Sequence, residues 1–133
     1  MNCVFCAIVS DNNPHHEIVW QDGAHVAFLS IRPTAPGHTL VIPRDHVDYA
    51  FDLNAPAFGA LMEASRKIAV PLKELTGAVR IGLAIDGFQV PHAHVHLVPV
   101  HQSGDLCLSP QDIAPEELRA TGDRFRAAYA SIP

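Results

Sequence analysis

The chain has 133 residues, of which 48% are hydrophobic and 17% charged, so it has room for one domain with a substantial core and not for two. Its 9 Lys and Arg residues against 14 Asp and Glu residues give a net charge of −5, which argues against a nucleic-acid partner because such partners need a basic face. No apolar stretch approaches the roughly 20 residues that cross a bilayer, and no signal peptide is evident, so we expect a cytoplasmic protein without a membrane partner.

The first half of the chain predicts strands after a short helix or turn over residues 3–9. Residues 17–21 and 25–31 are apolar runs separated by Asp22-Gly23-Ala24, a favourable hairpin turn. Residues 39–42 form a further β-branched run. Three antiparallel strands are therefore expected here.

The second half predicts two helices and two further strands. Asn54 precedes a long segment with apolar residues at three- and four-residue intervals, and Gly77 is placed to end it. Pro71 lies inside this pattern and predicts a kink or a break near Val70. Residues 115–129 open with Pro-Glu-Glu, which is typical of a helix start, while 79–85 and 92–98 complete the sheet.

Three histidines at alternate positions, His92, His94 and His96, are the most informative feature of the chain. In an extended strand, side chains two residues apart project from one face, so the three imidazoles would share a surface while Ala93 and Val95 enter the core. Neutral imidazole is both a metal ligand and a nucleophile. The row therefore predicts either a metal site or a nucleophilic centre.

A second motif, Cys3-Val4-Phe5-Cys6, has the spacing with which two thiolates bind one zinc ion. A pair of buried thiols and a redox pair are the alternatives, and the redox pair is the weaker because only two residues precede Cys3. Cys107 has no partner in the sequence. Four other histidines fit no useful spacing and are expected to be ordinary solvated residues: His15, His16, His25 and His101.

The segment His92-Ala93-His94-Val95-His96-Leu97-Val98 resembles the signature of the histidine triad (HIT) family, in which histidines alternate with apolar residues. The resemblance extends from Cys3 to about His101 and includes Val26-Ala27-Phe28 and the run from Pro33 to Pro43 followed by His46. It implies a single α+β HIT domain over residues 1–133, with a core at about 3–101 and a C-terminal extension at 102–133. The expected fold is a five-stranded antiparallel sheet with one long helix and a C-terminal helix.

The resemblance also implies catalytic roles. HIT proteins are nucleotide hydrolases and transferases in which the middle histidine, here His94, attacks the α-phosphorus and forms a nucleotidyl-histidine intermediate. His96 would contact the phosphate oxygens, His92 would help to hold the row, and His38 matches the fourth histidine of the family's relay. No metal is expected at the attacking residue.

Zinc-containing HIT relatives imply a structural zinc ion held by Cys3, Cys6, His46 and His92. The implied substrate site departs from the family in two places. Ser30 stands where many members have an aspartate that binds the ribose, and the loop at 86–91 is shorter than the glycine-rich loop of the family, although Gln89 offers an amide donor there. The apolar residues expected to form the base pocket are Ile18, Phe28 and Ile31.

These features predict a HIT-type enzyme that cleaves at the α-phosphate of a nucleoside phosphoramidate, an adenylylated conjugate or a dinucleoside polyphosphate. Two alternatives are a metal-dependent hydrolase with the histidine row as ligands and a nucleotide-binding or scaffold protein with little catalysis. The Hint and Fhit branches of the family are dimers joined edge to edge. A homodimer through residues 79–85 or the long helix is therefore expected, with a small nucleotide as substrate.

Overall fold

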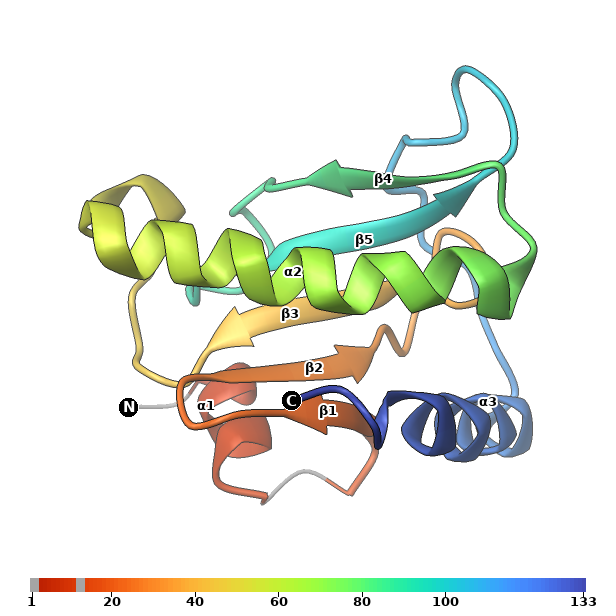
Figure 1. Ribbon diagram of the computed structural model, residues 1–133, viewed down its shortest axis with the longest axis horizontal. Helices are drawn as coiled ribbons and strands as arrows, with labels where there is room; N and C mark the ends of the chain where they lie inside the picture. Colours follow the sequence, from red (N-terminus) through yellow and green to blue (C-terminus); the bar gives the residue numbers. More distant parts are fainter. Residues whose placement is uncertain (1–2, 12–13) are drawn as a thin grey trace.

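A five-stranded antiparallel sheet organises residues 3–11 and 14–133, the parts of the chain that the computed structural model describes (Figure 1). The sheet order is β1-β2-β3-β5-β4, and each neighbouring pair is antiparallel. The strands are β1 (Ile18–Gln21), β2 (His25–Leu29), β3 (Thr39–Pro43), β4 (Arg80–Ala84) and β5 (Val95–Val100). The predicted α+β class and the five-stranded antiparallel sheet are confirmed.

The long helix α2 (Ala55–Thr76) starts and ends where the sequence indicates. The Asn54 side chain accepts a hydrogen bond from the backbone N–H of Ala57, and Gly77 ends the helix at a φ of 69°. Of the kink or break predicted near Val70, the break is wrong, because the helix continues through Pro71. Pro71 removes one helical hydrogen bond, but the neighbouring Ile68 and Leu72 are fully buried, and this packing holds the helix together.

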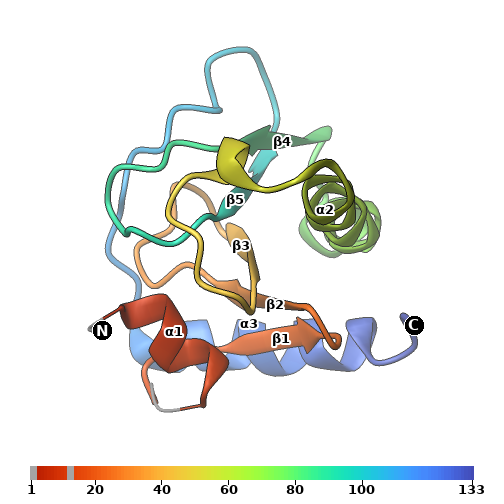
Figure 2. The same cartoon turned by 90° about the vertical axis from the view of Figure 1, so that its left-hand side faces the viewer.

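The sheet separates two apolar layers, and α1 (Val4–Val9) and α2 lie on its opposite faces (Figure 2). Alternating strand residues such as Ala27, Val41 and Val95 belong to the core under α2. Their neighbours Phe28 and Leu40 belong to a smaller cluster with α1. Strand residues two apart share a face, so each strand contributes to both layers.

The C-terminal helix α3 (Pro115–Tyr129) has the predicted bounds and lies beside β1 (Figure 1). Phe125 and Tyr129 are fully buried in the core under α2. Arg126 donates hydrogen bonds to the Ile18 carbonyl at 2.8 Å and to Glu17 at 3.0 Å. The C-terminal extension therefore supplies side chains to the main core.

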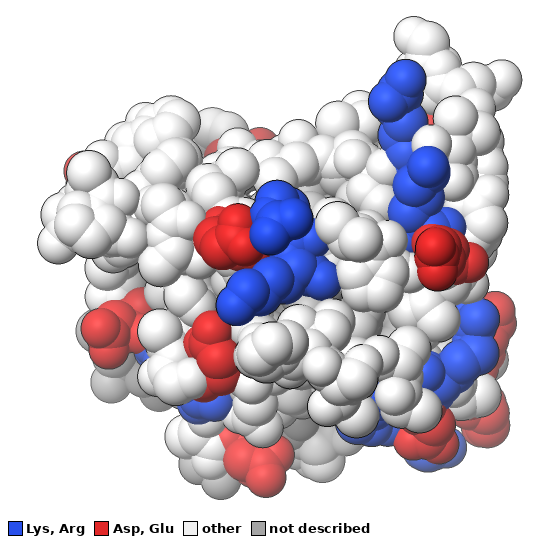
Figure 3. Space-filling view, in the orientation of Figure 1, with Lys and Arg blue, Asp and Glu red and all other residues white. Residues whose placement is uncertain are grey.

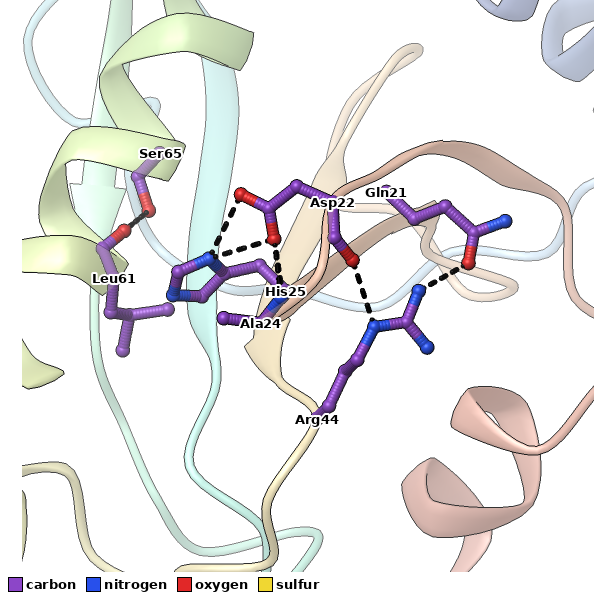
Figure 4. Close-up of polar contacts among 7 residues, drawn as sticks. All are labelled: Gln21, Asp22, Ala24, His25, Arg44, Leu61 and Ser65. Atoms are coloured by element: carbon purple, nitrogen blue, oxygen red, sulfur yellow. Dashed lines mark hydrogen bonds and ion pairs between the residues drawn. The ribbon is translucent and has the colours of Figure 1, made fainter. Parts of the chain in front are cut away.

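The turn between β1 and β2 corrects the expectation for His25 (Figure 4). His25 is only 5% exposed, and its Nδ1 lies 3.2 Å from Oδ1 of Asp22, which also accepts the backbone N–H of Ala24. The histidine is held by the turn aspartate and is not an ordinary solvated residue. Arg44 donates from Nε to the Asp22 carbonyl at 2.9 Å, so this turn also anchors the segment that leaves β3.

The short helix η1 (Ala50–Asp52) connects that segment to α2. On the face drawn in Figure 3, basic and acidic side chains lie close to one another among uncharged residues. Among the described residues, no helix combines the length and the apolar character needed to cross a membrane.

Candidate active site

A cavity of about 360 Å³ lies on the α1 side of the sheet and contains the histidines that the sequence singled out. His38, His94 and His96 line it together with Val4 and Phe5 from α1. Its size is in the range of small-molecule sites. Two of the three row histidines therefore face a space that a small ligand can enter.

The row itself differs from the expectation, because β5 starts at Val95 and not at His92. The backbone N–H of Ala93 bonds to the Val47 carbonyl at 2.6 Å, outside the β3 ladder, so His92 and His94 precede the strand. Ala93 and Val95 are buried as predicted. His92 is fully buried and is absent from the cavity lining, so the three rings do not share one surface.

The hydrogen bond of His94 fixes its tautomer. Nδ1 lies 2.7 Å from the backbone carbonyl of His92, which can only accept, so Nδ1 carries the proton. Burial lowers the pKa of His94, although the His92 carbonyl and the nearby Asp86 oppose this shift. A neutral ring with an unprotonated Nε2 is the form that attacks an electrophile.

A second chain of hydrogen bonds fixes His38 and His96. The backbone N–H of Thr34 donates to Nδ1 of His38 at 3.0 Å, so the proton of His38 is on Nε2, and this nitrogen lies 3.0 Å from Nδ1 of His96. His96 accepts that bond and keeps its own proton on Nε2. Burial lowers the pKa of each ring to about 4, and His94 adds to the shift of His96. Both rings are therefore neutral near pH 7, and His96 is a hydrogen-bond donor.

Phe5 joins α1 to these histidines. Its ring centroid lies 5.1 Å from that of His94 and 5.2 Å from that of Phe28, both in edge-to-face geometry. Phe5 is only 5% exposed, so it closes the space beside His94. The position of α1 therefore decides the shape of the cavity next to the candidate nucleophile.

Four side chains near the start of α1 have the arrangement of a zinc site: Cys3, Cys6, His46 and His92. Their ligand atoms all lie within 4.8 Å of one another. The Sγ of Cys6 lies 3.2 Å from Nδ1 of His46 and 3.5 Å from Nδ1 of His92, while the Sγ of Cys3 lies 3.6 Å from the latter atom. Zinc bonds of about 2.3 Å to sulfur and about 2.0 Å to nitrogen place tetrahedral neighbours roughly 3.5 Å apart.

His92 has the tautomer that such a site needs. Its Nε2 donates to the Pro43 carbonyl at 2.8 Å, which leaves the lone pair of Nδ1 facing the cysteines. Burial also lowers the pKa of His92 and so favours the neutral ligand form. The donor set and its orientation therefore fit zinc.

The nitrogens of the three row histidines are directed to different partners. Within the described ranges 3–11 and 14–133, the side chains whose ligand atoms gather closely enough to hold one metal ion are Cys3, Cys6, His46 and His92. Nδ1 of His92 faces the cysteines, and Nδ1 of His94 faces the backbone carbonyl of His92. Nδ1 of His96 faces Nε2 of His38. The alternative in which the row binds a catalytic metal stays a prediction that these contacts do not support.

The predicted substrate contacts divide into two groups. Ser30, Ile31 and Gln89 line the cavity, whereas Phe28 and Ile18 do not. Phe28 is fully buried between the rings of Phe5 and His16, and Ile18 packs against the same apolar cluster. Phe28 therefore has no surface free for a ligand, which argues against its contact with the base, while the contact of the partly exposed Ile18 with the base stays a prediction.

Several lining residues were missed by the sequence interpretation. Asp86, Arg32 and Thr34 are polar members of the lining, and Leu108 and Pro110 reach it from the segment before α3. Thr34 lies in the run from Pro33 to Pro43 and Asp86 in the loop at 86–91, so the sequence signalled their segments, whereas no spacing signals Arg32, Leu108 or Pro110.

His16 corrects a further expectation. It lines the cavity and its ring contacts Phe28, and burial lowers its pKa, so it is not an ordinary solvated residue. Among the described residues, its buried Nδ1 has no hydrogen-bond partner. His101, in contrast, is exposed as expected.

Comparison with known proteins places this geometry in a wider group. The sequence model of the HIT domain matches residues 11–103. An uncharacterized HIT-like protein of Mycobacterium tuberculosis is 35% identical over 98% of this chain and 94% of its own. An adenosine 5′-monophosphoramidase of Schizosaccharomyces pombe is 28% identical over 94% of this chain and 96% of its own.

A solved structure is similar over nearly the whole chain. It is a Zn-bound histidine triad family protein from Mycobacterium smegmatis, with 35% identity, a TM-score of 0.80, and coverage of 99% of this chain and 96% of the other.

Proposed function

Because this chain belongs to the HIT family, we propose that it is a nucleotide hydrolase or nucleotidyltransferase that acts at the α-phosphate through a nucleotidyl-histidine intermediate. Nucleotide hydrolysis is the activity that family membership supports, and the fission yeast relative is named an adenosine 5′-monophosphoramidase. Nucleoside phosphoramidates, adenylylated conjugates and dinucleoside polyphosphates are the proposed substrates. The observation that carries the proposal is the fixed tautomer of His94 in the cavity wall.

His94 is the proposed nucleophile. Its Nε2 lone pair forms a bond to the α-phosphorus while the P–N or P–O bond to the leaving group breaks, and the leaving group takes up a proton from solvent. The Nδ1–H bond to the His92 carbonyl stabilises the positive charge that the ring gains in this step. Water then attacks the same phosphorus, breaks the bond to Nε2 and releases the nucleoside monophosphate.

His96 and His38 are proposed to stabilise the charge on the phosphate oxygens. The Nε2–H of His96 is free to donate because its Nδ1 accepts from His38. The Thr34 backbone N–H holds His38 in the matching tautomer. Donors that are fixed before the reaction stabilise developing charge without reorganising.

Zinc is the proposed structural cofactor, held by Cys3, Cys6, His46 and His92. The fit of the donor atoms and the Zn-bound mycobacterial relative support this proposal. The ion would join α1 to the segment after β3 and to the residue that orients His94. Its proposed contribution is positional, and no metal is proposed at the attacking nitrogen.

The central experiment traps the intermediate. The protein is incubated with adenosine and guanosine phosphoramidates and dinucleoside polyphosphates, and acid-labile nucleotidylated protein is located by mass analysis. We expect the label on His94 of the unaltered protein and no label in His94→Ala. Circular dichroism checks that His94→Ala is folded. His101→Gln, in an exposed loop, is the matched control and should be labelled normally.

Three results distinguish the possibilities. Turnover that persists in His94→Ala, or a label on another residue, contradicts the assignment of the nucleophile. Nucleotide binding with neither label nor turnover supports the alternative of a binding or scaffold protein. Label together with product confirms the enzyme.

A further inference from the structure

A guanidinium and a hydroxyl lie in the cavity lining apart from the histidines. Arg32 is the only Lys or Arg among the described lining residues, and Asp86 is the only Asp or Glu there. Ser30, two residues before Arg32, lines the same space. The reaction proposed for the histidines uses neither of these side chains. Both are therefore available to bind a different group of the ligand.

The guanidinium of Arg32 is available to an incoming anion. Its side chain is 63% exposed, and its ion-pair partner is Asp112 at 3.6 Å, which is itself 97% exposed. An exposed pair at this distance is weak in water. A ligand phosphate inside the cavity, which can accept two parallel N–H bonds, would replace Asp112.

The hydroxyl of Ser30 has a free proton to donate. Its Oγ accepts the backbone N–H of Arg32 at 3.3 Å, which leaves the O–H without an acceptor among the described residues. The same bond holds Ser30 and the backbone of Arg32 in one tight turn. Hydroxyl and guanidinium are thus presented as donors from a single short segment.

The distance from the histidines follows from the sheet. The backbone N–H of Ser30 bonds to the His38 carbonyl, and Leu40, two residues after His38, pairs with His96. Ser30 directly follows β2, His38 directly precedes β3 and His96 lies in β5, and by alternation their side chains are on the cavity face of the sheet. Two strand spacings of about 4.8 Å and two residues along the strand at about 3.3 Å each separate the Cα atoms of Ser30 and His96 by roughly 12 Å.

We propose that Ser30 and Arg32 form a second phosphate subsite, so that the substrate is a nucleotide with a further phosphate besides the reacting one. The inference rests on the proposed function, since it takes the histidines as the site of the reacting phosphate. The second phosphate is either on the ribose or at the far end of a polyphosphate chain. Both sources present the same chemistry to Arg32.

Direct binding to the whole protein tests the proposal without reliance on turnover. Calorimetry compares AMP with adenosine 3′,5′-bisphosphate, adenosine 2′,5′-bisphosphate and adenosine 5′-tetraphosphate. We expect at least one of the three to bind about tenfold more tightly than AMP, a ratio that Arg32→Gln reduces to about one. Arg32→Lys should keep part of the ratio, because it keeps the charge and loses the fork.

Asp112→Asn is the matched control. It removes the competing carboxylate and leaves Arg32 in place, so the ratio should be kept or increased. A preference for a ribose bisphosphate assigns the second phosphate to the sugar, and a preference for adenosine 5′-tetraphosphate assigns it to the chain. Either result supports the subsite.

Two results overturn the inference. In the first, all four nucleotides bind with the same affinity. In the second, Arg32→Gln weakens the binding of AMP as much as the binding of the other ligands, which would assign Arg32 to the reacting phosphate. His94 labelling of the unaltered protein decides the proposed function separately, so the two failures are distinguishable.

Discussion

At the scale of single residues, the site depends on which ring nitrogen carries a proton. His94, His38 and His96 each use Nδ1 in a bond with a fixed direction, and these bonds determine that Nε2 of His94 is bare while Nε2 of His96 is protonated. The His92 carbonyl, which can only accept, fixes His94, and the Thr34 N–H, which can only donate, fixes His38 and through it His96. The reactive form is therefore set by the fold.

The first prediction concerns the pH dependence of activity. Burial holds the pKa of His38 and of His96 at about 4 and lowers the pKa of His94. With a dinucleoside polyphosphate as substrate, kcat/KM should stay constant as pH falls from 7 through 6.5 and should decline only well below that value. A decline centred at the usual histidine pKa of about 6.5 would contradict this.

The same shifts predict how stability changes with pH. The unfolded chain protonates His38 and His96 near pH 6.5, whereas the folded chain takes up these protons only near pH 4. The unfolded state thus binds more protons between these values, and the free energy of unfolding should fall as pH drops through this window. Urea titrations at pH 7 and pH 5 measure the difference in the free energy of unfolding between the two pH values. His38→Gln should make this difference smaller.

At the scale of elements, the turn before β3 positions His38. Gly37 has a φ of 92°, and a Cβ there would lie 2.6 Å from Cγ2 of Thr76 at the end of α2. Gly37→Ala is therefore expected to lower the free energy of unfolding by about 1–3 kcal/mol. Activity should also fall, because the next residue is His38.

Gly23→Ala is the control for this substitution. A Cβ added at Gly23 would meet open space, so Gly23→Ala should change the free energy of unfolding little. Denaturant unfolding of both variants gives the comparison. Equal stability of the two variants would show that the crowding at Gly37 is relieved by a shift of Thr76.

Zinc gives a prediction for α1. Protein purified without added metal should contain about one zinc ion per chain, and Cys6→Ser should lose it and melt at a lower temperature. Cys107→Ser is the control, since Cys107 is exposed and outside the metal group. Substoichiometric metal in the unaltered protein would argue against the site.

Some elements could be predicted from local sequence and others could not. The bounds of α3 follow from Pro115 and the residues after it, because helix starts have local chemistry. The start of β5 at Val95 does not, because it depends on a bond from Ala93 to the distant Val47. The continuity of α2 through Pro71 likewise depends on core packing that the local rule for proline omits.

The same distinction applies to the site. Spacing alone identified the histidine row and the cysteine pair, because their members are neighbours in sequence. Asp86, Arg32 and Leu108 reach the cavity through loops whose paths are decided by the whole fold. Local periodicity has no signal for such residues.

At the scale of the whole molecule, the edge of the sheet predicts an assembly. In the described part of the chain β4 pairs with β5 alone, and Leu83 on β4 is 40% exposed beside a groove shared with α2. Edges of this kind are suited to pairing between chains. We expect a homodimer, with light scattering giving twice 14.4 kDa.

Leu83→Arg should shift this protein toward the monomer. Phe51→Ser, at another exposed apolar residue on η1, should leave the dimer intact. A monomeric mass for the unaltered protein at micromolar concentration would refute the dimer. A loss of dimer in both variants would refute the assignment of the edge.

The short helix α1 takes part in two sites at once. Cys3 and Cys6 belong to the metal group, while Val4 and Phe5 are part of the cavity lining. Two ligands that bind through one shared element are thermodynamically linked, and linkage is reciprocal. Nucleotide should therefore raise the equilibrium affinity for zinc by the same factor by which zinc raises the affinity for nucleotide, so that metal supply becomes a control on substrate capture.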